Sequence, residues 1–496
     1  MAPLPYEGVE KEAGKKMSRA ASHTIGIDEG TTGVRAIVVD ESGALVGHAY
    51  RPVRADYPQP GWIEHPAEEL WQTTNAVLAG ALDNAGLRAD EIAAIGIANQ
   101  RGAAAIFDPT GKPLGPILGW QDQRTAARCV ELLGEGFFVI PNTAASKYEW
   151  LLREHGAGVS DVRLGTIDTY LACRLSEGGV FASDHSNYSV SGVYEFFAGT
   201  LDQRTIDHLK IDASILPKLA DSSGILGETS ARVFGAEVPI AALAGDQHAA
   251  MYAQGCREVG TIEIEIGTSA MVKRNEGASL GDAPEGSYPL VLWALDGSRT
   301  FCFESPVITA GAAAGWLLEG LGLVADIKSL EPLARSVEDS GGVWAVPALA
   351  GLGGPHLDLD ARGMIGGISR ATSRAHIARA MIEGIAWRCA EAAVALGGEA
   401  GPARIRVAGG AADNDLLLQL MADASGAEVE RPELLDRAAL GAAYLAQRAL
   451  GMTTDDEVAH RWQASRNFTP SWSEDERATR REKWLSRIAL ARTAGT

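Results

Sequence analysis

The sequence predicts an α/β protein made of two domains, and three observations support this fold class. The chain has 496 residues, more than one compact core usually holds. Nearly half of the residues are apolar (46%), which is enough to fill two cores. A strand, a turn of small residues and a second strand open each half, at residues 25–39 and 261–273. We interpret this pattern as a weak internal duplication with a boundary near residues 253–258, although short glycine–threonine turns also recur by chance.

The composition disfavours several classes of protein. A formal net charge of −20 argues against nucleic acid or an anionic membrane as a main partner. The five cysteines are scattered and form no C-x-x-C pair, which argues against a disulfide scaffold and a thiolate zinc site. No apolar run approaches the ~20 residues that cross a bilayer. We expect a soluble, cytoplasmic protein that acts on a small molecule.

The ends of the predicted domains follow from the same pattern. Residues 1–22 are polar and charged, so we expect a disordered tail, with Met17 as an alternative start of translation. An N-terminal domain is expected over residues 23–253 and a C-terminal domain over residues 254–496. The sequence is compatible with a homo-oligomer as well as a monomer.

The N-terminal half is predicted to begin with an antiparallel meander. Residues 25–28 form an apolar strand, residues 29–33 a turn, and residues 34–39 and 44–50 two further strands. A helix is expected over residues 66–84, because a proline suits its first turn and Glu68 and Glu69 suit the positive end of its dipole. The apolar strand at 92–98 ends in Asn99, Gln100 and Arg101. Open α/β sheets bind ligands at such carboxyl ends of strands.

The C-terminal half repeats this order. Strands are predicted at residues 261–266, 270–273 and 405–408, with small-residue turns at 267–269 and 409–411 and a helix starting near Asn414. The apolar stripe of a helix over residues 376–396 indicates a core-facing element.

Two turns resemble phosphate-binding loops in composition. The turns Gly30-Thr31-Thr32-Gly33 and Gly267-Thr268-Ser269 offer backbone N–H groups and hydroxyls, although no Walker sequence is present. Each turn alone is better explained by an ordinary hairpin, but one in each half favours phosphates held from both sides. The turn at 409–411 either admits an adenine or ribose close to the backbone or is a plain tight turn.

Three aspartates are candidates for chemistry: Asp28, Asp122 and Asp246. A carboxylate at a strand end beside phosphates can hold Mg²⁺, and a second one can accept the proton of an attacking hydroxyl. An aspartate next to a glycine is also a common turn or cap residue. Trp120, with Arg101 and Gln247, is of the kind that lines a polyol pocket, the alternatives being a core tryptophan and a solvated arginine.

Taken together, these motifs resemble the FGGY carbohydrate kinases, and the glycerol kinases among them most. The similarity covers residues 25–468. It is carried by Gly26-Ile27-Asp28-Glu29-Gly30-Thr31-Thr32, Asn99-Gln100-Arg101, Trp120-Gln121, Lys147-Tyr148-Glu149-Trp150-Leu151, Ala244-Gly245-Asp246-Gln247, Gly267-Thr268, Gly351-Leu352-Gly353, Ala361-Arg362-Gly363, Gly363-Met364-Ile365-Gly366-Gly367-Ile368 with His376-Ile377 and Glu383, and Ala439-Leu440-Gly441-Ala442-Ala443.

The resemblance implies two actin-like ATPase domains of the ribonuclease-H-like type, with the active site in the cleft between them. It implies ATP and Mg²⁺ as cofactors, Asp246 as the catalytic base and Asp28 as a carboxylate associated with the metal. Arg101, Trp120, Asp246 and Gln247 match the family's substrate contacts. The residues that match its nucleotide contacts are Thr31, Thr32, Arg35, Thr268, Gly311, Gly410 and Asn414.

Three departures from the glycerol kinase pattern concern the substrate pocket. A glutamate that binds two glycerol hydroxyls is replaced by Gly102, a tyrosine by Asn142 and a phenylalanine by Met271. Each hydrogen bond to a charged group is worth roughly 1.5–3 kcal/mol, so losing two weakens glycerol recognition by on the order of 10²-fold. We therefore expect a larger substrate, such as a tetritol, pentitol or ketose, with Asp122 and Arg124 supplying the missing contacts.

The sequence thus predicts a kinase that transfers a phosphoryl group from Mg-ATP to a hydroxyl of a small polyol or sugar. One alternative is a glycerol kinase proper, whose pocket is completed by other residues. Another is an actin-like ATPase or sugar-sensing module without transfer activity, against which Arg101 and Gln247 argue.

Overall fold

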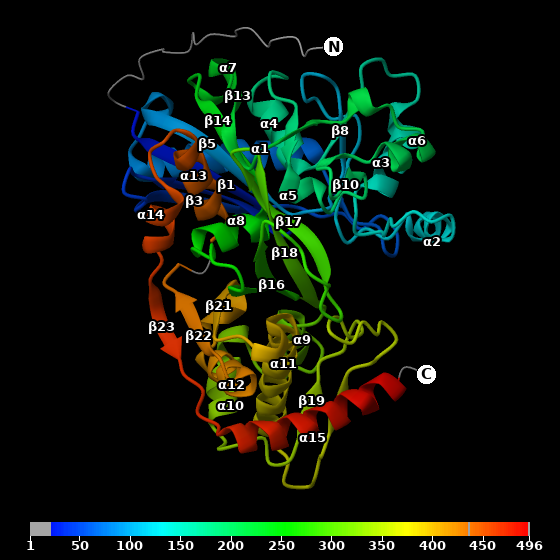
Figure 1. The fold of residues 1–496 in the computed structure, drawn as a ribbon, viewed down its shortest axis with the longest axis vertical. Coiled ribbons are helices and arrows are strands. Elements are labelled where there is room, and N and C mark those ends of the chain that lie inside the picture. The colour runs from blue at the N-terminus through cyan, green and yellow to red at the C-terminus, as the bar shows by residue number, and fades with distance from the viewer. Residues whose placement is uncertain (1–20, 435–436, 495–496) are drawn as a thin grey trace, which may run out of the picture.

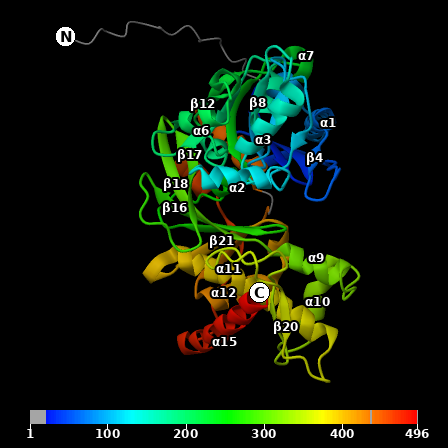
Figure 2. The same ribbon diagram turned by 90° about the vertical axis from the view of Figure 1, so that its right-hand side faces the viewer.

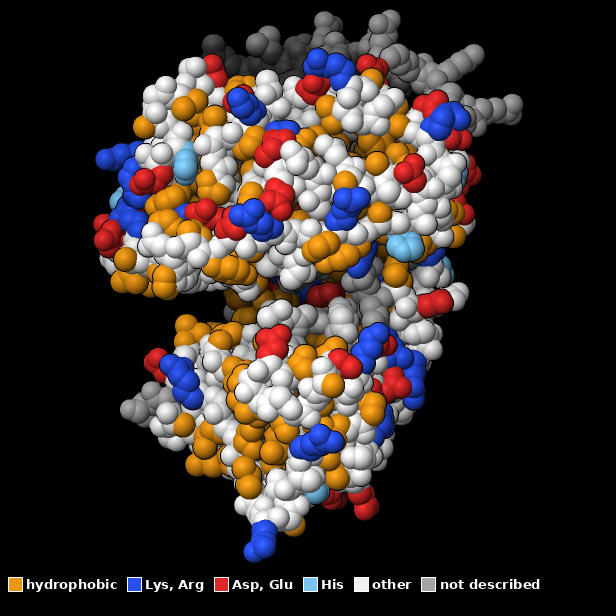
Figure 3. Space-filling model, turned by 180° about the vertical axis from the view of Figure 1, so that it is seen from behind, with side chains coloured by type: hydrophobic (Ala, Val, Ile, Leu, Met, Phe, Trp, Pro, Cys, Tyr) orange, Lys and Arg blue, Asp and Glu red, His pale blue; other side chains and the backbone are white. Residues whose placement is uncertain are grey.

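The computed structural model describes residues 21–434 and 437–494, which form two lobes stacked along the long axis (Figure 1). Most of the predicted N-terminal tail lies outside the described residues. From behind, a deep groove separates the lobes on one side of the molecule (Figure 3). Among the described helices, none is long and apolar enough to cross a membrane.

A six-stranded sheet forms the upper lobe. Its order is β13 (Ser223–Glu228), β14 (Pro239–Gly245), β5 (Ile92–Asn99), β1 (His23–Gly30), β2 (Gly33–Val39) and β3 (Leu45–Pro52). The predicted meander is present, since β1, β2 and β3 pair antiparallel in chain order. Strands β1, β5 and β14 run parallel, and Asn99 pairs with both Glu29 and Gly245. Their carboxyl ends therefore meet at one edge.

A seven-stranded sheet forms the lower lobe. Its order is β17 (Tyr288–Leu295), β18 (Ser298–Val307), β16 (Ala270–Gly277), β15 (Ile262–Ile266), β21 (Arg404–Ala408), β22 (Glu428–Pro432) and β23 (Ala464–Phe468). Strand β15 pairs antiparallel with β16 and parallel with β21, as β1 does with β2 and β5. Strand β22 continues the parallel run and β23 closes it antiparallel, as β14 and β13 do in the upper lobe. The internal duplication is thus visible in the strand order.

Helices flank both sheets. In the side view, α9 to α12 and α15 gather in the lower lobe (Figure 2). The helices are α1 (Ala67–Ala85), α2 (Ala126–Gly134), α3 (Ala145–Leu151), α4 (Ile167–Leu175), α5 (His185–Tyr188), α6 (Gln203–His208), α7 (Ala231–Phe234), α8 (Asp246–Ala253), α9 (Gly311–Glu319), α10 (Leu330–Arg335), α11 (Arg374–Gly397), α12 (Asp415–Ser425), α13 (Ala438–Ala449), α14 (Asp455–His460) and α15 (Glu474–Thr493). Short strands complete the fold: β4 (Glu64–His65), β6 (Ala105–Phe107), β7 (Ile117–Leu118), β8 (Arg163–Gly165), β9 (Ala182–Asp184), β10 (Tyr194–Glu195), β11 (Thr200–Leu201), β12 (Lys218–Ala220), β19 (Trp344–Val346) and β20 (Met364–Gly366).

Helix α13 belongs to the second half of the chain but packs on the upper sheet (Figure 1). Glycines make this close approach feasible. A Cβ on Gly26 of β1 would lie 1.8 Å from the carbonyl oxygen of Ala439, and one on Gly96 of β5 would lie 2.0 Å from that of Ala442. The hairpin β17–β18 also reaches the upper lobe, where Ser222 N donates to Ala294 O (2.8 Å). Cutting the chain near residue 254 therefore does not separate the lobes in space.

Candidate active site

The carboxyl ends of β1, β5 and β14 bring three predicted site residues to one edge of the upper sheet. Asp28 lies near the end of β1, Arg101 follows β5, and Asp246 follows β14 as the first residue of α8. The parallel register explains this convergence, although the three residues are far apart in the sequence. A carboxylate, a guanidinium and a second carboxylate are thus gathered beside the turn at residues 30–33.

The Arg101 side chain lies at the centre of this cluster and is almost completely buried. Its Nη2 donates to Gln247 Oε1 (2.5 Å) and to Glu304 Oε2 (2.8 Å), and its Nε lies 4.0 Å from Asp246 Oδ1. Burial works against the charged form, but Glu304 and Asp246 more than offset it, so the pKa of Arg101 is raised. Arg101 is therefore a fixed cation beside Asp246.

Asp246 has the properties of a general base. Its Oδ1 accepts the backbone N–H of Gln247 (2.8 Å), while about a quarter of its side chain stays exposed. Burial raises the pKa of Asp246 above its usual range, and Arg101, the Gln247 N–H and Lys273 act in the opposite direction. A carboxylate with a raised pKa is a better proton acceptor than an ordinary surface aspartate.

A row of polar residues on the lower sheet faces this cluster, and sequence reasoning missed it. Lys273 pairs across the strands with Glu263 and with Glu304, and Glu304 pairs with Tyr288. Lys273 Nζ lies 2.7 Å from Glu263 Oε2, both side chains being fully buried, and the Tyr288 hydroxyl donates to Glu304 (2.6 Å). The alternating sequence Ile-Glu-Ile-Glu-Ile of β15 was the available signal, because charges at every second position lie on one face.

Trp120 and Thr31 meet through side-chain hydrogen bonds. The indole Nε1 of Trp120 donates to Thr31 Oγ1 (3.1 Å), and Thr31 Oγ1 donates to Gln100 Oε1 (3.2 Å). Gln100 Nε2 donates in turn to the buried Glu29 (3.1 Å). The structure therefore brings a predicted substrate contact and a predicted nucleotide contact into direct contact, with Gln100 and Glu29 bonded behind them.

The other residues predicted to contact the nucleotide lie on turns and helix ends, except Arg35, which lies in β2. Thr32 is exposed in the first turn, and the Arg35 guanidinium lies 5.4 Å from the centre of the Tyr50 ring. In the lower lobe Thr268 is exposed, and its carbonyl oxygen accepts the N–H of Ala310 (3.1 Å), next to Gly311 at the start of α9. The remaining two, Gly410 and Asn414, lie between β21 and α12, where Asn414 Oδ1 caps the helix by accepting from the N–H of Leu417.

The lower turns pack tightly and expose backbone. A Cβ on Gly311 would lie 2.3 Å from Gly267 O, and one on Gly409, which has a φ of +88°, would lie 2.6 Å from Ile266 O. Such glycine turns suit the close approach of a phosphate or ribose, so the residues present fit a nucleotide. The described residues contain no group of three or more His, Cys, Asp or Glu suited to a metal. The association of Asp28, near the end of β1, with Mg²⁺ stays a prediction of the family resemblance.

Asp122 and Arg124, which were expected to supply the missing polyol contacts, are bonded to each other. Asp122 Oδ2 accepts the N–H of Ile63 (2.6 Å), and both Asp122 oxygens accept from Arg124. The Arg124 guanidinium lies over the rings of Trp62 (3.9 Å) and Trp150 (4.4 Å). Both side chains are fully buried, so they support the loop behind Trp120, and a contact of Asp122 with a polyol stays a prediction.

Gly102 and Asn142 lie together beside this loop. Gly102 has a φ of +73°, and a Cβ there would lie 2.1 Å from the carbonyl oxygen of Asn142, whose side chain is exposed. The buried Lys147 donates to Gly102 O (2.9 Å) and to Trp120 O (3.4 Å). The backbone of this chain thus leaves no room for a side chain at position 102.

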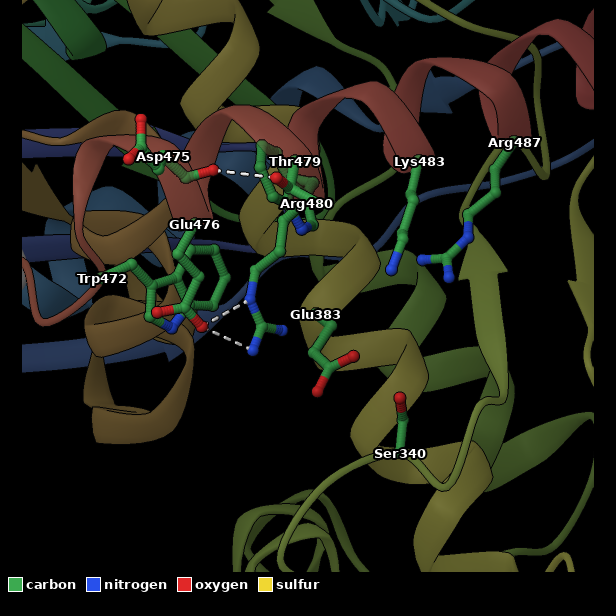
Figure 4. Close-up of a pocket in the computed structure, with 10 residues that line it drawn as sticks. Ser340, Glu383, Trp472, Asp475, Glu476, Thr479, Arg480, Lys483 and Arg487 are labelled. Atoms are coloured by element: carbon green, nitrogen blue, oxygen red, sulfur yellow. Dashed lines mark hydrogen bonds and ion pairs between the residues drawn. The ribbon is translucent and has the colours of Figure 1, made fainter.

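A pocket of about 550 Å³ lies elsewhere, between α11 and α15 of the lower lobe (Figure 4). Its charges largely compensate one another, since Arg480 pairs with Glu476 and Arg379 pairs with Glu383. None of the predicted site residues lines it.

Two family models match most of this chain. The model of the N-terminal domain of the FGGY family of carbohydrate kinases matches residues 23–253, and that of the C-terminal domain matches residues 263–450. The chain belongs to the FGGY family of carbohydrate kinases. It is therefore an enzyme that phosphorylates an alcohol group, and its two lobes have the actin-like ATPase fold.

Several relatives of this FGGY kinase are glycerol kinases. One from Deinococcus radiodurans is 39% identical, covering 95% of this chain and 97% of the relative. One from Bordetella parapertussis is 40% identical, covering 94% and 97%. Two solved structures share the fold: a Plasmodium falciparum glycerol kinase with ADP (TM-score 0.86, 23% identity, 95% and 98% covered) and a Lactobacillus acidophilus xylulose kinase (0.83, 21%, 94% and 97%).

Proposed function

We propose that this FGGY kinase transfers the γ-phosphoryl group of ATP to a hydroxyl of a polyol or sugar larger than glycerol. The observation that carries the choice of substrate is the backbone at Gly102. Its positive φ and the Asn142 carbonyl leave no space for the acidic side chain expected of a glycerol pocket. The neutral carbonyl and the exposed Asn142 amide offer weaker, more adaptable contacts. A longer acceptor carries more hydroxyls, and its additional hydrogen bonds replace the binding energy lost with the acidic side chain.

The proposed transfer needs few groups. Asp246 accepts the hydroxyl proton while the substrate oxygen attacks in line, and Arg101 keeps Asp246 ionised and oriented. Trp120 stacks on the C–H face of the acceptor, and Gln247 and Asn142 bond its hydroxyls. Bound Mg²⁺ would neutralise charge on the phosphate oxygens, with Asp28 holding it directly or through water.

The nucleotide is proposed to lie between the lobes. Thr31, Thr32 and Arg35 contact its phosphates from above, and Thr268 and Gly311 from below. Gly410 and Asn414 border the adenine and ribose. Residues 23–253 carry the acceptor and the base, and residues 254–496 contribute most nucleotide contacts. The groove between the lobes supports this division, because closure there would exclude water from the reacting phosphate. We propose a cytoplasmic enzyme.

A second candidate is a glycerol kinase proper, favoured by the relatives that are 39–40% identical over most of the chain. An assay of ADP release with MgATP and a panel of glycerol, tetritols, pentitols and ketoses distinguishes the candidates. Clear preference for an acceptor of four or more carbons supports the proposal, and a higher kcat/KM for glycerol than for every other acceptor overturns it. ADP release that no acceptor stimulates would instead favour an ATPase or sensor without transfer.

A further inference from the structure

A chain of side-chain hydrogen bonds connects the two proposed binding regions of the upper lobe. It runs from Trp120 Nε1 to Thr31 Oγ1 (3.1 Å), from Thr31 Oγ1 to Gln100 Oε1 (3.2 Å), and from Gln100 Nε2 to both oxygens of Glu29 (3.1 and 3.3 Å). Trp120 belongs to the proposed acceptor pocket and Thr31 to the proposed phosphate turn. Gln100 touches neither ligand in this scheme.

The hydroxyl of Thr31 carries one hydrogen, and Gln100 receives it. The Thr31 side chain therefore cannot donate to a phosphate oxygen unless its bond to Gln100 breaks. The same oxygen also accepts the indole N–H of Trp120, so a rotation of the hydroxyl alters the bond that orients the indole. A change at the phosphate turn is thus transmitted to the acceptor pocket through one atom.

The inner end of this chain is rigid, whereas its outer end is partly exposed. Gln100 and Glu29 are buried, and the backbone N–H of Gln100 donates to Glu29 O (2.7 Å) where β5 runs beside β1. Trp120 and Thr31 keep part of their surface exposed. Burial raises the pKa of Glu29 well above its usual range, with Gln100 opposing and Asp28 and Asp246 adding to the rise. We therefore expect the Trp120 indole and the Thr31 hydroxyl to move when a ligand binds, whereas the Gln100 amide stays in place.

We propose that Gln100 is a positioning residue that couples the phosphate turn to the acceptor pocket by fixing the Thr31 hydroxyl and, through it, the Trp120 indole. The idea rests on the proposed function, which places the acceptor at Trp120 and phosphates at Thr31. The coupling is reciprocal: if nucleotide binding reorients the indole and strengthens acceptor binding, the acceptor strengthens nucleotide binding by the same factor.

The first test observes Trp120 directly and needs no acceptor. The full chain is labelled with 5-fluorotryptophan, its Trp120 ¹⁹F signal is assigned with Trp120→Phe, and MgADP is added to saturation as judged by calorimetry. We expect this signal to shift in the wild type and in Thr31→Ser, which keeps the hydroxyl. It should shift little in Thr31→Val and Gln100→Leu. Gln123→Leu is the matched control, because that exposed amide donates only to Gln121 O.

Two outcomes of this test overturn the proposal: equal shifts in Thr31→Val and the wild type, or no shift in a wild type saturated with MgADP. A second test measures the dissociation constant of MgADP with and without the best acceptor of the panel. The wild-type ratio should differ from one by about fivefold or more, and in Gln100→Leu it should fall to within about twofold of one. An unchanged ratio in Gln100→Leu also overturns the coupling. The assay of ADP release with the acceptor panel is a separate experiment. A failure of the proposed function can therefore be distinguished from a failure of this coupling.

Discussion

The turn after β1 and the turn after β15 hold corresponding places in the two sheets, yet they are built differently. In the upper lobe, Thr31 is tied by its side chain to Trp120 and Gln100. In the lower lobe, the Thr268 side chain is exposed, and the backbone carbonyls of the turn accept from the start of α9. One turn is thus held by side chains and the other by backbone. The two copies of a duplicated sheet can therefore serve different purposes. The turn of the upper sheet is suited to selecting an acceptor, and the turn of the lower sheet is suited to accommodating a nucleotide.

The carboxylates of the two sheets differ in the same way. Asp28 and Glu265 both stand two residues before the glycine of their turn. The pKa of Glu265 is raised well above its usual range, chiefly by burial and then by the neighbouring Glu263. Burial therefore works against the charged form of Glu265, and Asp28 stays the carboxylate that we propose to associate with the metal.

The largest expected effect comes from removing the base of the upper lobe. Asp246→Asn keeps the shape of the side chain but cannot accept a proton, so kcat should fall by about 10³-fold. MgADP affinity, measured by calorimetry, should stay within about twofold of the wild type. An Asp246→Asn enzyme that retains a tenth of wild-type kcat would contradict the assignment of the base.

The buried pair of the lower lobe should affect stability more than chemistry. Lys273→Met leaves Glu263 buried without its cation and should cost about 3–5 kcal/mol of unfolding free energy. Lys273→Met combined with Glu263→Gln removes both charges and keeps an acceptor for Gln254, which donates to Glu263 in the wild type (2.9 Å). The double variant should therefore recover most of the loss in urea unfolding. A double variant as unstable as the single one would mean that the pair is not the source of the effect.

The third prediction concerns the helix that crosses between the halves. In Gly26→Ala the new methyl group would meet the Ala439 carbonyl at 1.8 Å and push α13 away from β1. We expect a loss of about 1–3 kcal/mol, seen as a lower urea midpoint and faster proteolysis near α13. Gly134→Ala is the matched control, because no atom lies within 4 Å of the added Cβ. Equal midpoints for the two variants would contradict the packing argument.

The smallest expected effect separates structure from nucleotide binding in the lower lobe. Asn414 caps α12 and Ser473 caps α15, each through a side-chain oxygen that accepts a backbone N–H. Replacing either by alanine should cost about 1 kcal/mol. Only Asn414→Ala should also raise the KM for ATP, because Ser473 caps α15, a helix at the periphery of the lower lobe (Figure 1). If both variants change this KM alike, Asn414 has no contact with the nucleotide.

Local sequence patterns predicted much of this molecule. The strand–turn–strand units and the helix after Pro66 were predicted within a few residues, because hydrophobic periodicity and turn residues act over short distances. The family resemblance was confirmed by both domain models. Asp28 and Arg101 were expected at the ends of strands, but their convergence with Asp246 became visible only from the parallel register of β1, β5 and β14.

Features that depend on long-range register were not predictable in this way. Glu304 follows Arg101 by 203 residues in the sequence. It became visible as the partner of Arg101 only once β18 lay beside β16 in the lower sheet. The bond of Asp122 to the Ile63 N–H was not predicted, because it arises from a loop folded back over 59 residues. The catalytic and binding roles of the site residues stay predictions, which the experiments above address.

The crossing of α13 to the upper lobe has a consequence for biosynthesis. The sheet that starts at His23 keeps its glycine-lined face uncovered until residues up to Ala449 have left the ribosome. The first lobe made is thus among the last to be completed, and a nascent chain carries an open apolar surface through most of its translation. Fragments ending near residue 253 should consequently aggregate or recruit chaperones during synthesis, whereas chains that extend past α13 should not.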